Sequence, residues 1–111
     1  MGTAKTNMYT PKFTITHKIT QDIEKIGQLC RRKGVLFHTD ATQTFGKEKI
    51  DVRQFGVDLL SASAHKIHGP RGVGFLYIRD GLNIEPLLHG GGQEKGLRSG
   101  TENVPGIVGF S

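Results

Sequence analysis

Apolar side chains recur at helical spacing near the start of the chain. On a helix with 3.6 residues per turn, one face would carry the apolar residues Ile19, Ile23, Ile26, Leu29 and Cys30. Thr20 suits the N-cap position, acidic residues fall in the first turn, and basic residues fill the last turn before Gly34. The pattern predicts an α-helix over residues 20–33.

Three short apolar runs follow, and each is rich in residues that favour strands: "VLFHT" (35–39), "VDLLSASA" (57–64) and "GVGFLYI" (72–78). The first two are typical of buried parallel strands, and residues 50–56 between them suit a short helix or a turn. The short link "HKIHGPR" predicts an antiparallel or irregular connection between the second and third strands. A weaker alternation at 13–16 fits an edge strand within an irregular lead-in, residues 1–18. This order of elements indicates an α/β protein.

Composition narrows the class of protein. The 111 residues suit one domain, and fifteen Lys and Arg against ten Asp and Glu give a formal net charge of +5. The basic residues are scattered along the chain, so solvated faces explain them better than a nucleic-acid surface does. The single cysteine, Cys30, excludes an internal disulfide and suits a core position on the apolar helix face. No apolar stretch has membrane-spanning length, so we expect a soluble, cytoplasmic protein that binds neither membrane nor nucleic acid.

Two of the predicted strands end in chemically distinctive residues. Asp40 follows one strand and Lys66 follows another, and ligands of open α/β sheets gather at the carboxyl ends of strands. Ser63, His65 and Gln43 lie nearby in sequence, and the glycine turns offer N–H groups to a phosphate. A partly buried amine that condenses with an aldehyde, and a carboxylate that holds a pyridinium proton, are what pyridoxal 5′-phosphate requires of a protein.

Each of these residues also has a plain structural explanation. Asp40 can cap a turn, Lys66 can lie on a solvated face, and the histidines at 65 and 68 can be ordinary turn residues. The glycine-rich tail "HGGGQEKGLRSGTENVPG" is too long for a plain connection and suits a loop that contacts a ligand or a partner.

Longer stretches carry a family resemblance. "FHTDATQTFGK", "DLLSASAHKIHGPRGVGFLYIR" and "HGGGQEKGLRSGTENVPGIVGF" strongly resemble the cysteine desulfurases of class V aminotransferase type, which supply sulfur for iron–sulfur clusters. The resemblance implies the central part of the large, cofactor-binding domain of a fold-type I pyridoxal-phosphate transferase over residues 19–111. Such a domain has a mixed, mostly parallel sheet with flanking helices. Residues 1–18 do not match.

The resemblance also implies individual roles. Lys66 in "SAHK" matches the lysine that binds the cofactor covalently and then moves protons, and His65 joins it as a catalytic candidate. Asp40 in "TDATQ" matches the partner of the pyridinium nitrogen, and Gln43 matches the residue that binds the phenolic oxygen. Ser63 and His65 match phosphate ligands. Thr101 in "RSGTEN" matches a threonine that reaches the neighbouring subunit's phosphate, which implies a homodimer.

Other family features have no counterpart in these 111 residues. The resemblance leads us to expect a phosphate loop and a ring-stacking histidine before this segment, and a nucleophilic cysteine loop and a substrate-binding arginine after it. Cys30 does not match that nucleophile. We therefore expect a fragment truncated at both ends that does not turn over L-cysteine alone, with a sulfur acceptor or scaffold protein as a further partner.

Three alternatives remain open at this stage. The first is a fragment of a selenocysteine lyase or another class V enzyme. The second is a basic module that binds polyanions, although the chain lacks aromatic stacking platforms and a concentrated basic stripe. The third is a remnant without function that folds poorly alone because its sheet edges are open.

Overall fold

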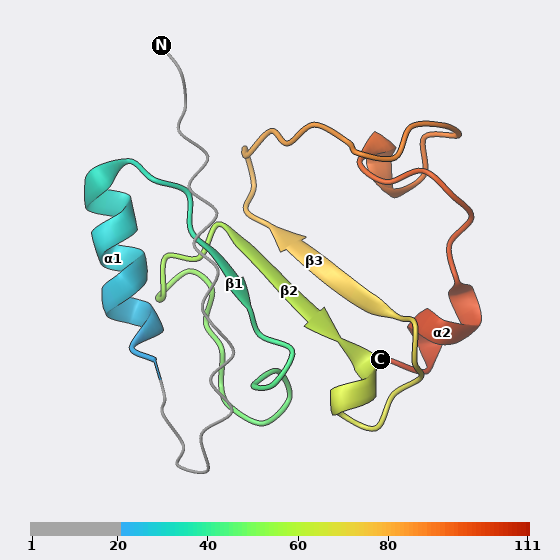
Figure 1. Cartoon of the computed structure of the whole chain (residues 1–111), viewed down its shortest axis with the longest axis horizontal. Helices are drawn as coiled ribbons and strands as arrows, with labels where there is room; N and C mark the ends of the chain where they lie inside the picture. Colours follow the sequence, from blue (N-terminus) through green and yellow to red (C-terminus); the bar gives the residue numbers. More distant parts are fainter. Residues whose placement is uncertain (1–20) are drawn as a thin grey trace.

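The structure, a computed structural model, describes residues 21–111. Figure 1 shows helix α1 (Ile23–Lys33) alongside a sheet of three strands, β1 (His38–Asp40), β2 (Leu59–Ser63) and β3 (Gly74–Ile78). A single helical turn, η1 (Ala64–Lys66), follows β2 directly. Beyond β3, a long C-terminal segment holds the turn η2 (Glu94–Gly96) and the short helix α2 (Val104–Val108). The weak strand predicted at 13–16 and the lead-in at 1–18 lie outside the described residues.

Helix α1 begins later than the sequence pattern suggested. Its N-cap is Asp22, whose carboxylate accepts the backbone N–H of Lys25 at 3.0 Å. The same carboxylate forms an ion pair with the Lys25 ammonium at 2.8 Å. Asp22 thus occupies the capping position predicted for Thr20, which lies outside the described residues. The helix ends as predicted at Gly34, whose φ of 64° is in the left-handed region that suits glycine.

The sheet has the order β1-β2-β3 and is mixed, as expected. Strands β1 and β2 are parallel, with Asp40 opposite Ser61, whereas β2 and β3 are antiparallel, with Ser63 opposite Gly74. The short link between β2 and β3 therefore does join antiparallel strands. All three strands lie inside or beside the predicted runs but are shorter, and residues 50–56 form turns.

The boundary of β1 has a specific cause. The sequence predicted a strand over 35–39, but the ladder begins only at His38. The backbone N–H of Phe37 is bound instead by the carboxylate of Asp58 at 2.8 Å. The N–H of Val35 likewise donates to the carbonyl of Cys30 at 3.0 Å, so regular strand pairing starts three residues later than predicted.

The core lies on one face of the sheet. It contains Phe37, Val57, Leu60, Ala62 and Cys30, which are all buried, and α1 contributes Ile23 and Ile26 to it. Cys30 is thus a core residue, as expected. Across residues 21–111, no helix has the length and apolarity needed to cross a bilayer.

Candidate functional site

The two parallel strands end on the same side of the sheet, and this end of the sheet, where β1 and β2 finish, is called the carboxyl edge, or simply the edge, below. Asp40 is the last residue of β1, and it pairs with Ser61, two residues before β2 ends at Ser63. Side chains alternate along a strand, so Asp40, Ser61 and Ser63 share the face of the sheet opposite Leu60 and Ala62. The structure therefore places the carboxylate of Asp40 and the hydroxyl of Ser63 on one face at one edge.

Asp40 also starts the turn that follows β1. Its Oδ1 accepts the backbone N–H of Thr42 at 2.9 Å, which confirms the expectation that this residue caps a turn. Phe45 N–H then donates to the carbonyl of Ala41 at 2.8 Å, and Gln43 lies exposed between them. The turn holds Gln43 close in sequence to the carboxylate and open to solvent.

Lys66 lies in a tight loop at the end of β2. The N–H groups of Ile67 and Gly69 both donate to the carbonyl of Ala64, each at 3.0 Å, and the N–H of Ala64 donates to Val73. A Cβ at Gly69 would lie 2.8 Å from the Ala64 Cβ, so a side chain at that position cannot be accommodated without a shift. The backbone that carries Lys66 is therefore held closely, although its side chain is exposed.

The loops that carry Asp40 and Lys66 touch each other. A Cβ at Gly46, in the turn after β1, would lie only 3.0 Å from Cγ2 of Ile67, the residue directly after Lys66. In the same turn, the ring of Phe45 meets the ring of Phe75 on β3 edge to face, with 5.0 Å between centroids. The approach of Gly46 to Ile67 sets the Asp40 turn against the Lys66 loop, and the ring contact holds the same turn to β3, so residues 40, 43 and 66 lie in one region.

Ser63 and His65 form a polar pair beside Lys66. The Ser63 Oγ lies 2.7 Å from Nδ1 of His65, and it also donates to the carbonyl of Val73 at 3.4 Å. The direction of the first hydrogen bond depends on the histidine tautomer. Ser63 is half-buried and His65 is exposed, so the pair presents a hydroxyl and an imidazole at the surface.

Two expectations about this region need comment. Lys66 is exposed within the described residues, which agrees with the alternative of a solvated face and not with the partial burial expected of a cofactor lysine. Thr101 is exposed on the segment that leads into α2, and within residues 21–111 no hydrogen bond joins it to Lys66, Ser63 or His65. Helix α2 itself packs through Gly106 against Val73, which lies next to the Lys66 loop.

The glycine-rich tail forms a closed loop. The side-chain oxygen of Gln93 accepts the N–H of Gly100 at 3.0 Å, and the N–H of Ser99 donates to the carbonyl of Leu88 at 3.3 Å. Gly90 and Gly100 have φ values of 158° and 118°, so this closure depends on backbone conformations that favour glycine. The role of this loop in binding a ligand or partner stays a prediction.

The chemical types of the groups at this edge match those that bind pyridoxal 5′-phosphate. An amine, a carboxylate, a hydroxyl and an imidazole lie after adjacent parallel strands, together with the amide of Gln43. The amine can condense with an aldehyde, the carboxylate can hold a pyridinium proton, and the hydroxyl and imidazole can bind a phosphate. This donor set is the observation on which the assignment of a cofactor depends.

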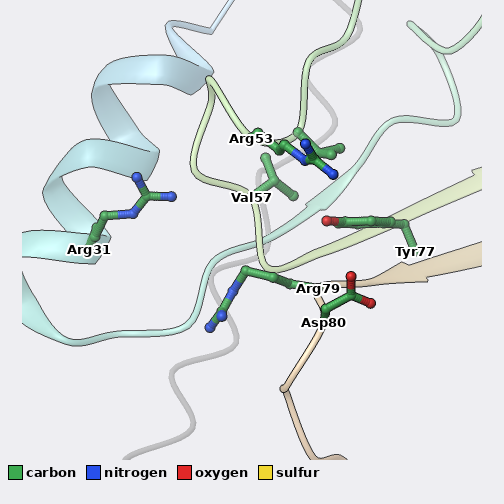
Figure 2. A pocket seen from close by; sticks show the side chains of 7 residues that line it. Arg31, Arg53, Val57, Tyr77, Arg79 and Asp80 are labelled. Atoms are coloured by element: carbon green, nitrogen blue, oxygen red, sulfur yellow. The ribbon is translucent and has the colours of Figure 1, made fainter.

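Sequence reasoning missed a second cluster at the opposite end of the sheet. A cavity of about 430 Å³ lies there, lined by Arg31, Val52, Arg53, Val57, Tyr77, Arg79 and Asp80. Figure 2 shows their side chains and labels all of them but Val52. These residues come from segments far apart in the chain, and the arginines among them are exposed, as the scattered basic residues were expected to be. No spacing pattern in the sequence marks them as neighbours.

A mixed sheet with a lysine loop and an aspartate turn after its parallel strands defines an α/β protein with groups that suit a bound ligand at the carboxyl ends of the strands. The chain belongs to the aminotransferase class-V family, whose family model matches residues 9–111. Members of this family use pyridoxal 5′-phosphate. The match begins within residues 1–18, and a domain boundary at residue 18 stays a prediction.

Individual relatives narrow the comparison from the whole family to particular proteins within it that are similar in sequence or structure. The chain is 56% identical over 90 residues to a cysteine desulfurase IscS of Clostridium botulinum, covering 81% of this chain and 23% of the relative. Among solved structures, SspA in complex with cysteine has a TM-score of 0.79 and 50% identity, covering 82% of this chain and 27% of that one. A NifS-like protein from Rickettsia africae has a TM-score of 0.78 and 43% identity, covering 81% and 25%. The chain thus spans about a quarter of the length of the relatives that it matches.

Proposed function

We propose that this chain supplies the cofactor-anchoring segment of a pyridoxal-phosphate-dependent cysteine desulfurase, with Lys66 as the residue that binds the cofactor covalently. The observation that carries the proposal is the position of Asp40 and Lys66 on two touching loops at one edge of the sheet. It is supported by the relatives named cysteine desulfurase and by a structural neighbour that was solved with cysteine.

Each group at the edge has a role in this proposal. The carboxylate of Asp40 holds the proton on the ring nitrogen, and the amide of Gln43 binds the phenolic oxygen. Ser63 and His65, already joined at 2.7 Å, bind the phosphate. When bound, the cofactor supplies an electron-poor ring that accepts the electrons of a carbanion. The amine of Lys66 moves protons at the substrate carbon, and His65 assists it as the second catalytic residue.

The substrate in this proposal is L-cysteine, and the products are L-alanine and a persulfide on a nucleophilic thiol. The only thiol of the 111 residues belongs to Cys30, which is 4% exposed within the core beneath α1. A thiolate must reach the substrate sulfur to accept it, and Cys30 cannot do so without unfolding part of the core. The isolated 111-residue chain therefore does not release alanine or sulfide in this proposal.

Partners follow from the same assignment. Thr101, exposed on the segment before α2, contacts the cofactor phosphate of a second subunit, so the complete site belongs to a homodimer. A sulfur-acceptor or scaffold protein receives the persulfide for iron–sulfur cluster assembly. The setting is the cytoplasm, where reducing conditions keep Cys30 a thiol.

The proposal is tested by mapping where the cofactor attaches. The purified chain is incubated with pyridoxal 5′-phosphate and reduced with borohydride, which fixes the C=N bond between an amine and the aldehyde. Peptide mass spectrometry then measures the fraction of each lysine that carries the adduct. We expect Lys66 to be labelled at least about tenfold more than any other lysine, because only its loop adjoins a phosphate site and a ring-nitrogen partner.

Two variants serve as controls for this experiment. Lys66→Ala should abolish the dominant adduct, whereas Lys47→Ala, which removes an exposed lysine from the neighbouring turn, should leave it unchanged. Labelling spread evenly over the exposed lysines would refute the assignment of Lys66.

A further inference from the structure

A cavity lies at the end of the sheet away from Lys66. Arg79 and Asp80 follow β3, and Val57 precedes β2, so the cavity adjoins the amino end of β2 and the carboxyl end of β3. Its volume of about 430 Å³ falls within the usual range of about 300–1,000 Å³ for small-molecule sites. The cofactor site described above does not use any of its residues.

Three arginines line this cavity from three different segments, and the guanidinium of Arg79 points away from Arg53 and Tyr77 in Figure 2. Arg31 comes from the last turn of α1, Arg53 from the turns at 50–56, and Arg79 from the end of β3 (Figure 2). Arg31 packs close to the neighbouring turn, because a Cβ at Gly56 would lie 3.3 Å from its Nη2 atom. The folded arrangement of α1, the turns and β3 therefore gathers these charges.

The charges around the cavity are not balanced. Arg79 forms an ion pair with Asp58, with 2.6 Å between Nε and Oδ1. The other carboxylate oxygen of Asp58 accepts the backbone N–H of Phe37. Among residues 21–111, neither Arg31 nor Arg53 has an ion pair, and Asp80 is the one carboxylate that lines the cavity. The pKa of Asp51 is lowered by the backbone N–H of Gln54 and, to a smaller extent, by the nearby charge of Arg53, so Arg53 has a carboxylate close by, whereas Arg31 forms no ion pair within residues 21–111.

We propose that this cavity binds a small phosphate-bearing molecule, independently of the cofactor edge. Guanidinium groups present paired N–H donors that match phosphate oxygens, and the half-buried Tyr77 offers a hydroxyl beside them. Val52 and Val57 supply an apolar wall for the body of such a molecule. The cavity is open to solvent on one side, and its volume of about 430 Å³ suits a compact ligand that inserts its phosphate between the arginines.

Inorganic pyrophosphate is the probe that tests the site. It is titrated into the ¹⁵N-labelled full chain at constant ionic strength, and the amide shifts are followed by NMR. We expect saturable shifts clustered at Val57, Tyr77 and Asp80. Arg53→Ala and Arg31→Ala should each weaken binding about tenfold, because each removes charge-assisted hydrogen bonds to the anion.

Matched variants separate this site from general electrostatics. Arg32→Ala removes the same charge from the same turn of α1, outside the cavity, and should change affinity less than about twofold. Arg53→Lys should recover part of the affinity lost in Arg53→Ala, and thermal unfolding checks that each variant is folded. Shifts centred on Ser63 and His65, equal losses in Arg32→Ala and Arg31→Ala, or tighter binding of a hexaglutamate peptide than of pyrophosphate would overturn the proposal.

Discussion

Asp22 shows how one side chain sets the start of an element. Its carboxylate caps α1 through the Lys25 N–H and pairs with the Lys25 ammonium. The hydrogen bond from the Lys25 side chain, more than any other contact, lowers the pKa of Asp22 below its ordinary value of 3.8. A carboxyl group with a lowered pKa stabilises the fold while it is ionised and loses that contribution as pH falls through the lowered pKa.

This predicts a pH-dependent difference between the natural chain and Asp22→Asn. The asparagine still caps the helix but can neither titrate nor pair with Lys25. The natural chain should have the higher free energy of unfolding at neutral pH, and the difference should disappear as pH falls below 3.8. Urea unfolding followed by circular dichroism measures the free energy of unfolding of each chain at each pH. A difference between the two chains that stays constant from pH 7 to pH 2 would contradict the role given to the carboxylate.

Residue types and their positions along the chain predicted which candidate residues lie close together, whereas their chemical roles stay a prediction. Asp40, Ser63, His65 and Lys66 were expected together because they follow strands, and the register places them at one edge. The exposure of Lys66 was one of two alternatives that the sequence left open, because burial depends on contacts between distant segments, which sequence spacing does not report.

At the scale of elements, the packing of α1 depends on a glycine. Gly27 is buried in the helix, and a Cβ at that position would overlap the carbonyl oxygen of Phe55. The close approach lets Ile23, Ile26 and Cys30 reach the core. Helical periodicity predicted the apolar face, but it gave no sign that the helix backbone would lie directly against the 50–56 turns.

Gly27→Ala should therefore destabilise the chain, although alanine favours helix formation by about 1 kcal/mol over glycine. Forcing α1 away from the turn should lower the free energy of unfolding by about 1–3 kcal/mol. Gln28→Ala, at the exposed neighbouring position, should change it by less than about 0.5 kcal/mol. Unfolding in urea compares the two variants, and a Gly27→Ala chain as stable as the natural one would show that the helix and turn are not in close contact.

Strand boundaries illustrate what local patterns cannot supply. The run "VLFHT" gave the position of the first strand, but the Asp58 carboxylate, 21 residues beyond Phe37, takes the N–H that would have started it earlier. The order of elements, the antiparallel pairing of β2 and β3 and the mixed sheet were all confirmed. Local sequence thus predicts elements, and contacts between distant residues decide their ends.

At the scale of the whole molecule, the chain is one segment of a larger architecture in its relatives, about a quarter of their length. Several large apolar side chains are exposed among the described residues, including Leu76 on β3 at 48% and Leu87 at 90%. The site is likewise open at the Lys66 loop. The arginine cavity, by contrast, is built entirely from this segment, which is why it can be tested on the 111 residues alone.

The central claim is that Asp40 and Lys66 hold opposite ends of one cofactor molecule. A crystal structure of the chain after borohydride reduction with pyridoxal 5′-phosphate tests this most directly. We predict a covalent bond to Nζ of Lys66 and a carboxylate oxygen of Asp40 about 2.7–2.9 Å from the ring nitrogen. A cofactor attached to another lysine, or a ring nitrogen that points away from Asp40, would contradict the account.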